Sequence, residues 1–212
     1  MADEHRERSL ELDRVVNFSD GVFAISATLL VLSISVPHNL KGPGLDDKLW
    51  DAYSDALPHV LTYALSFFVI GRTWLAHHRM FKIVRRIDAR FVALNLVVLA
   101  FVAVLPFPTE VFGEYPSSRP ALIVYAGAIS ASGFASAALW WYAMRNNRLI
   151  DPATPREWVA HAHLRALTIP AVFLTSIPIS LISVGAAQFW WLWLIPLRSV
   201  LARRYGKITE IW

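Results

Sequence analysis

The 212-residue chain contains no cysteine. This absence excludes a disulfide scaffold, a metal site built from thiolates and a cysteine nucleophile. Charged residues are scarce too: they make up 17% of the chain, against roughly 25% in a typical soluble domain, whereas hydrophobic residues make up 56%. A soluble globule of this length would lack the polar residues to cover its surface, and the same composition excludes intrinsic disorder.

The sequence signatures of several enzyme classes are also missing. The chain has no His-Glu-x-x-His zinc motif, no Gly-x-Ser-x-Gly nucleophile elbow and no Walker phosphate-binding loop. The neighbouring His77 and His78 are poorly placed to chelate one metal ion, because adjacent side chains on a helix diverge by about 100°. We therefore expect a protein that is not an enzyme and that has no cofactor and no metal site.

The apolar residues instead gather into long runs. A transmembrane helix needs about 20 mostly apolar residues, and six runs are near this length. We interpret the chain as one all-α integral membrane domain, residues 1–212, with six transmembrane helices. The fifth and sixth helices are expected to form a hairpin with a tight turn around Gly185. The expected spans are 15–36, 59–78, 91–107, 121–144, 164–184 and 186–201, preceded by an N-terminal segment, 1–14, and followed by a tail, 202–212.

The basic residues predict the orientation of these spans. Sixteen of the 20 Lys and Arg residues fall in the N-terminal segment, the second–third and fourth–fifth connections and the C-terminal region, against three in the opposite connections. The side richer in Lys and Arg is expected to be cytoplasmic, so both termini are placed in the cytoplasm and the protein in the inner (plasma) membrane. Anionic lipid near these loops explains the basic charge balance, so we expect membrane lipid as a partner and no nucleic acid.

The first span carries two stripes that a lipid-facing helix does not need. At 100° per residue, one broad stripe contains Gly21, Ile25, Thr28, Leu32 and Ser35, with Leu29 at its border. Ser19, Ser26 and Ser33 recur every seven residues on a neighbouring face. These hydroxyls either bond to their own helix and pack against neighbours, or the first stripe lines an ion path narrowed by apolar side chains. Spacing alone leaves both interpretations open.

Polar side chains inside the second and third spans also require a reason, because ionisable groups are costly in a membrane. We expect Asn95 and one of the two histidines, His77 or His78, to form hydrogen bonds between helices. Arg72 is expected to reach the membrane interface or to pair with a carboxylate such as Asp20.

Three motifs follow one another on the first three spans. The first span contains Arg14-x-x-x-Phe18-Ser19-Asp20 and then Phe23-Ala24-Ile25-x-x-Thr28-Leu29-Leu30-Val31-Leu32. The second contains Trp74-x-x-His77-His78-x-x-Phe81, and the third contains Asn95-Leu96 with Pro106-Phe107. Together these motifs resemble the transmembrane protein 175 family, the endosomal and lysosomal potassium channels and their prokaryotic relatives. The resemblance is specific over residues 14–107, and beyond them it rests on span count and topology.

The resemblance implies a six-helix subunit that assembles with itself, as a homotetramer, with the first helices lining a central pore for potassium ions. It also implies that Ile25, Leu29 and Leu32 form an apolar constriction and that Thr28 contributes to potassium preference. A ring of Ile25 side chains offers no ligand to a cation, so the ion crosses partly hydrated, and we expect a modestly potassium-selective cation channel. The residues implied to tie helix 1 to helices 2 and 3 are Arg14, Phe18, Ser19, Asp20, Trp74, His77 and Asn95.

Three alternative functions stay open at this point. Asp20, Arg72 and His77 are ionisable groups inside spans, as in proton relays, which favours a proton-conducting or proton-coupled transporter. An intramembrane enzyme lacks a nucleophile–base pair with suitable spacing. A non-conducting scaffold is favoured only by small-residue pairs in the fourth span, which permit close helix contact within or between subunits. These pairs are Gly127/Ala131 and Gly133/Ala137.

Overall fold

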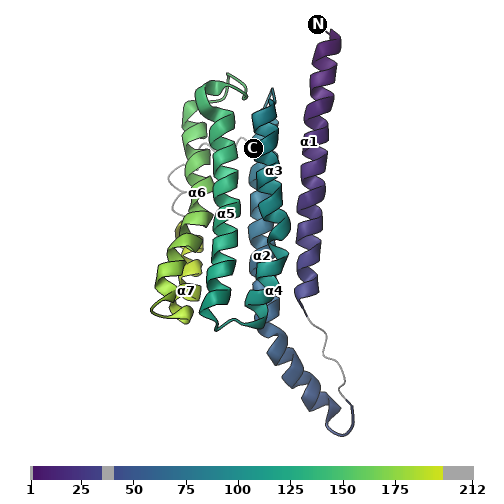
Figure 1. Ribbon diagram of the computed structural model, residues 1–212, viewed down its shortest axis with the longest axis vertical. Coiled ribbons are helices and arrows are strands. Elements are labelled where there is room, and N and C mark those ends of the chain that lie inside the picture. The colour runs from purple at the N-terminus through teal and green to yellow at the C-terminus, as the bar shows by residue number, and fades with distance from the viewer. Residues whose placement is uncertain (1, 35–40, 198–212) are drawn as a thin grey trace.

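The computed structural model describes residues 2–34 and 41–197, and side chains from residue 10 onward except those of 156–161. These residues are almost entirely helical (Figure 1), with an isolated antiparallel bridge between Val84 and Ile150. The helices are α1 (Ala2–Leu29), α2 (Leu45–Ile83), α3 (Ala89–Val104), α4 (Pro106–Glu114), α5 (Arg119–Met144), α6 (Arg156–Ser180) and α7 (Val184–Trp190), with 3-10 turns η1 (Leu30–Ser33), η2 (Arg145–Asn147) and η3 (Trp191–Trp193).

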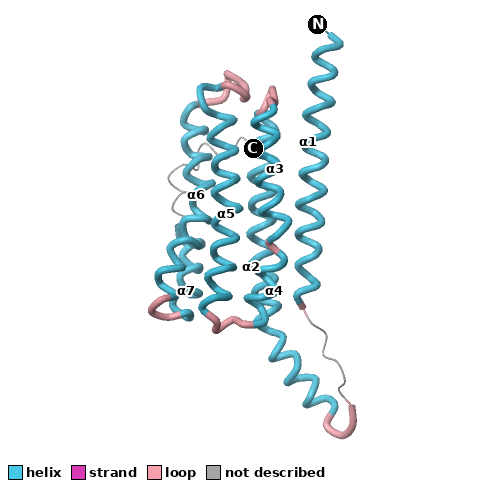
Figure 2. The backbone as a smooth tube through the Cα atoms, in the orientation of Figure 1, coloured by secondary structure: helices cyan, strands magenta, loops and turns pink. Residues whose placement is uncertain are grey.

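The helices form an elongated bundle with α1 at one edge and α6 and α7 at the other (Figure 1). Helix α1 packs on α2 and α3, and α5 packs on α6. The loops that follow α2 and α5 lie at the same end as the N-terminus, whereas those that follow α4 and α6 lie at the opposite end (Figure 2). The loops expected to share one side of the membrane are therefore gathered at one end of the bundle.

Four helical stretches in the described ranges are long and apolar enough to cross a membrane. They are Leu10–Ser33, Ala89–Glu114, Arg119–Asn147 and Ala162–Ser180, and the apolar stretch Val184–Leu197 is shorter. Helix α2 is not among them, although it is the longest helix of the bundle, with 39 residues. The coarse expectation of a helical membrane protein is therefore confirmed.

Several helix bounds differ from those expected from the apolar runs. The N-terminal segment is helical from Ala2 onward, and the expected second span is only the later part of α2. After a break at Leu105 the chain continues as α4 to Glu114, beyond the expected end of the third span at residue 107. Pro106 occupies the first turn of α4, where its missing N–H has no helical partner to lose.

The expectation of a turn around Gly185 is wrong. Helix α6 ends at Ser180, and α7 already begins at Val184, so Gly185 lies inside α7. The hydroxyl of Ser183 accepts a hydrogen bond from the N–H of Ala186 at 3.2 Å and thereby caps α7. Residues 35–36 at the end of the expected first span, 198–201 of the sixth and the tail 202–212 lie outside the described residues.

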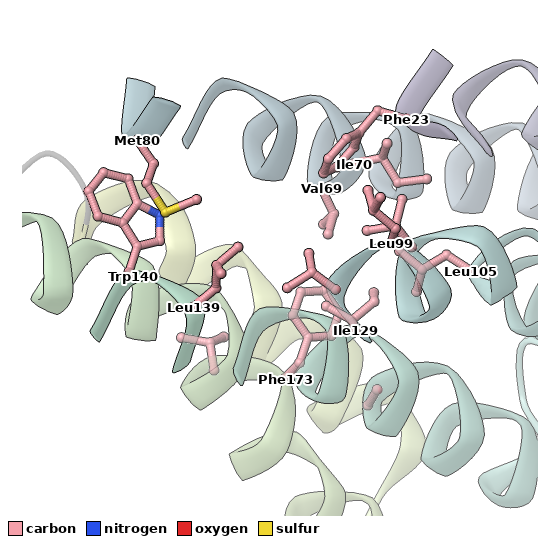
Figure 3. Packing of buried hydrophobic residues seen from close by; sticks show 14 of the residues in the cluster. Phe23, Val69, Ile70, Met80, Leu99, Leu105, Ile129, Leu139, Trp140 and Phe173 are labelled. Carbon is pink, nitrogen blue, oxygen red and sulfur yellow. The ribbon is translucent and has the colours of Figure 1, made fainter. Parts of the chain in front are cut away.

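Buried apolar side chains connect all the layers of the bundle (Figure 3). Phe23 of α1 lies beside Ile70 of α2, and Trp140 of α5 lies beside Met80 near the C-terminal end of α2 (Figure 3). The small-residue face of α5 packs within the subunit at Gly133, where an added Cβ would lie 2.8 Å from Pro170 of α6. At Gly133, therefore, the small residue serves close helix packing inside one chain.

Candidate functional site

The two stripes expected from the sequence lie on different faces of α1 and its continuation η1. Ser19, Ser26 and Ser33 are buried, interleaved with buried Phe23 and Leu30. The three- and four-residue spacings among these positions are those of a packed helix seam. Each serine hydroxyl also donates to a carbonyl oxygen of the preceding turn: Ser19 to Val15 at 2.7 Å, Ser26 to Val22 at 2.8 Å and Ser33 to Leu30 at 2.7 Å. The serine stripe therefore packs α1 onto its own subunit.

The other stripe lies on the far side of α1. Ile25 is 60% exposed and Leu32 is 72% exposed, and Leu29 and Thr28 are exposed beside them. The Thr28 hydroxyl donates to the carbonyl oxygen of Ile25 at 2.9 Å, so the threonine oxygen stays at the surface with a lone pair free. We call the face formed by Ile25, Thr28, Leu29 and Leu32 the open face of α1.

A chain of buried hydrogen bonds holds α1 against α2 and α3. His77 of α2 donates from Nε2 to Oδ1 of Asn95 at 2.7 Å, because the amide oxygen can only accept. The Nδ2 of Asn95 donates to the Ser19 hydroxyl at 3.0 Å, and that hydroxyl donates to the Val15 carbonyl. Among the described residues, the buried side-chain atoms without a hydrogen-bond partner belong to His59, Ser132 and Trp191, so none of them lies in this chain of hydrogen bonds.

Asp20 lies between this network and the open face. Its Oδ1 accepts a hydrogen bond from Nε1 of Trp74 at 2.8 Å. The Trp74 ring stacks on His78, with centroids 5.5 Å apart, while the His77 ring lies 5.2 Å from the ring of Phe23. The single carboxylate of this part of α1 is thus held by an indole N–H against α2.

The remaining members of the expected motif are placed differently. Arg14 is exposed and Phe18 is 58% exposed, and neither side chain takes part in the hydrogen bonds of the network. The structure therefore brings together Ser19, Asn95 and His77, and Asp20 with Trp74. The joint role expected for all seven motif residues stays a prediction.

Sequence reasoning missed a second buried polar cluster. The hydroxyls of Ser66 and Tyr125 are 2.8 Å apart, and that of Thr109 lies 2.9 Å from Ser66 and 2.7 Å from the Leu105 carbonyl oxygen. This cluster ties α2, α4 and α5 together next to the break between α3 and α4. Ser66 and Tyr125 lie inside apolar runs and Thr109 lies just beyond one, which was the available signal. No spacing rule links positions so far apart in the chain.

A charged cluster sits where α2 and α5 end, around Asp88, which lies just before the membrane-spanning stretch that starts at Ala89. The Asp88 carboxylate caps α3 by accepting from the N–H of Phe91 at 2.8 Å, accepts from the Tyr142 hydroxyl at 2.7 Å and lies 3.5 Å from Arg148. Burial raises the pKa of Asp88, but these two hydrogen bonds and the charges of Arg148 and Arg90 outweigh burial and hold the pKa below its ordinary value. This end of the bundle is therefore cross-linked through one carboxylate.

No three His, Asp or Glu side chains gather into a metal-binding group within residues 10–34, 41–155 and 162–197. The main feature of the site is α1, a long helix at the edge of the bundle. One face of α1 packs on α2 and α3, and its open face is left uncovered by the described part of the subunit.

Comparison with known proteins supplies the family context. A family model for the endosomal/lysosomal potassium channel TMEM175 matches residues 14–106. A potassium channel of Streptomyces collinus is 37% identical over 193 residues, which cover 85% of this chain and 91% of that protein. The crystal structure of a lysosomal potassium-selective channel TMEM175 homolog from Chamaesiphon minutus matches with a TM-score of 0.73 and 32% identity, over 92% of this chain and 97% of that one. The Bos taurus endosomal/lysosomal proton channel TMEM175 is 39% identical over 114 residues, which cover 50% of this chain and 24% of that protein.

Proposed function

The chain belongs to the TMEM175 family, and from this membership we propose that it is a potassium-permeable channel of the plasma membrane. In this proposal four copies surround a central pore lined by α1. Each subunit crosses the membrane six times, with α2 and the segment that begins at α7 adding to the four stretches of sufficient length and apolarity. Both termini then lie in the cytoplasm, together with the basic loops that share their end of the bundle.

The open face of α1 is the observation that carries this proposal. A helix at the edge of a bundle meets either lipid or another subunit. Lipid contact needs no threonine and no glycine, yet Thr28 is exposed on this face and Gly21, one turn before Ile25, is exposed too. The serine stripe already packs α1 onto its own subunit, so the open face is available to the other copies around the pore.

The side chains of the open face explain how such a pore treats ions. A fourfold ring of Ile25, extended by Leu29 and Leu32, excludes water from the path and offers no oxygen to a cation, as in hydrophobic constrictions. Potassium gives up its hydration shell at lower cost than sodium, so it passes more readily. The Thr28 hydroxyls, about one turn from Ile25, supply oxygen ligands beside the constriction. We therefore propose a modest preference for potassium.

The test is the ionic selectivity of the purified channel in liposomes or planar bilayers. Replacing Ile25 by Asn wets and widens the constriction, so sodium permeability is expected to rise relative to potassium in the bi-ionic reversal potential. The matched control is Leu174→Asn, which places the same amide on an exposed position of α6, at the opposite edge of the bundle. An unchanged reversal potential in Ile25→Asn, with conduction retained, rejects Ile25 as the constriction.

A second function is favoured by the polar groups behind α1. Asp20 and the His77–Asn95–Ser19 chain place a carboxylate and linked hydrogen bonds next to the open face, and the family includes vertebrate proteins named proton channels. A proton pathway would acidify liposomes under a voltage and lose this transport in Asp20→Asn. Current under voltage at equal pH, recorded with potassium and then with an impermeant cation on both sides, distinguishes the two functions, because only a potassium current disappears with the potassium.

A further inference from the structure

The first part of α2, residues 45–57, projects from the bundle and is here named the α2 arm (Figure 1). With 39 residues, α2 is about 58 Å long at 1.5 Å per residue. The hydrocarbon core is only about 30 Å thick, or about 40–45 Å with the headgroups. With Arg79 and Lys82 at one membrane surface, α2 crosses the hydrocarbon core before it reaches the arm, which lies beyond Pro58 and so outside that core.

The arm has three distinct faces. Ala52 and Ala56 turn toward their own bundle, where they line a cavity of about 460 Å³ together with the end of α4. A second face carries Asp47, Asp51 and Asp55 at four-residue spacing, and Asp55 also borders the cavity. The third face carries Trp50, Tyr53 and Leu57, which share one side of a helix through their three- and four-residue spacing.

This third face is apolar and open. Trp50 is 71% exposed, Tyr53 57% and Leu57 53%, so the described part of the chain leaves most of each side chain uncovered. The two aromatic rings meet edge to face, with centroids 6.1 Å apart and planes at 78°. The stripe continues one turn further at Leu61, which is 61% exposed, so it runs unbroken from the arm into the membrane-spanning part of α2.

Two observations argue against lipid as the covering partner. The arm begins about where the hydrocarbon core ends, because roughly 20 helical residues from Arg79 already span that core. Helices that lie on a membrane surface carry Lys and Arg on their polar face, whereas residues 45–57 contain four Asp and one Lys. An anionic lipid surface repels such a segment.

The position of the arm points to a second copy of the chain. The arm leaves the bundle on the side of α1 and ends beyond the last turn of α1 (Figure 1). In the proposed tetramer this side faces the pore axis, where neighbouring copies approach each other. We propose that Trp50, Tyr53 and Leu57 of each subunit dock on the adjacent subunit and that the four arms frame the outer mouth of the pore. This inference rests on the proposed function for its geometry, and it leaves the aspartate face in water.

Photo-crosslinking in proteoliposomes tests this contact. p-Benzoylphenylalanine replaces Tyr53 or Trp50 in the full-length chain, and the control carries it in place of Asp51. Irradiation is expected to give covalent products of two or more chains several-fold more efficiently at positions 50 and 53 than at 51. Equal yields at the three positions, or single-chain products carrying a lipid adduct, overturn the proposal.

A second measurement guards against misfolding and separates the two proposals. In mild detergent, Trp50→Ala combined with Tyr53→Ala is expected to reduce the fraction of assembled tetramer, whereas Asp51→Ala leaves it unchanged; equal assembly in both variants overturns the docking contact. If Ile25→Asn alters selectivity while positions 50 and 53 give no chain-to-chain products, docking fails and the channel proposal stands. If those products form while Ile25→Asn leaves selectivity unchanged, the docking contact stands and the proposed constriction at Ile25 fails.

Discussion

Replacing Asn95 by leucine removes the amide that joins three helices around α1. Leucine has a similar volume, so the change creates little cavity and isolates the loss of hydrogen bonds. Two bonds disappear: the one that His77 donates at 2.7 Å and the one that Ser19 accepts at 3.0 Å. Interhelical hydrogen bonds in membrane proteins contribute about 0.6 kcal/mol on average and at most about 1.7. We therefore expect a loss of about 1–3 kcal/mol.

The double-mutant cycle with His77→Phe makes this prediction specific. Phenylalanine fits among the aromatic rings of Phe23 and Phe81, which already flank the histidine. Each single variant leaves a buried polar partner unsatisfied, whereas the double variant removes both groups, so it is expected to be more stable than the sum of the single losses. The free energy of unfolding is measured in detergent with increasing SDS. A coupling below about 0.3 kcal/mol, the usual error of additivity, refutes the reasoning.

Three further changes follow from the same structure. Thr28→Ala is expected to lower the potassium-to-sodium permeability ratio while conduction persists, and an unchanged ratio in bi-ionic recordings contradicts a role for its oxygen. Gly133→Ala forces a methyl group against the proline ring of α6 and is expected to destabilise the protein by about 1–3 kcal/mol. The control is Gly127→Ala, where the added methyl group meets open space, and its melting temperature is expected to stay unchanged. Because the pKa of Asp88 is lowered on folding, its stabilising contribution is complete above the ordinary value of 3.8 and is lost as pH falls through the lower folded value. Tyr142→Phe is expected to shift that loss toward higher pH in acid-unfolding profiles.

The local sequence pattern was sufficient to predict features that belong to a single helix. The seven-residue recurrence of Ser19, Ser26 and Ser33 and the separate Ile25 stripe are properties of one helix, and the structure shows one stripe buried and the other exposed. The hydrogen bonds expected of Asn95 and His77 join these two side chains because both are polar groups with few partners in an apolar bundle.

The apolar runs predicted the wrong helix ends where polar residues continue a helix. Hydropathy placed the start of the second span at His59, but the helix already begins at Leu45. Asp46 and Asp47 favour the first turn of a helix, and Gly44, at the N-cap position, adopts the left-handed conformation with φ of 72°. The cap by Ser183 decided the start of α7 in a similar way. The Ser66–Tyr125–Thr109 cluster depends on how distant segments pack, which no local pattern contains.

Block by silver ions tests the central claim, that the open face of α1 lines the ion path, most directly. The natural chain has no cysteine, so Leu32→Cys carries the only thiol, and Ag⁺ is small enough to enter a potassium pore and bind it. The account predicts irreversible loss of potassium current in Leu32→Cys, with no loss in the cysteine-free chain or in Leu174→Cys. Full current after Ag⁺ has demonstrably reacted with the thiol of Leu32→Cys would place this face outside the pore and contradict the account.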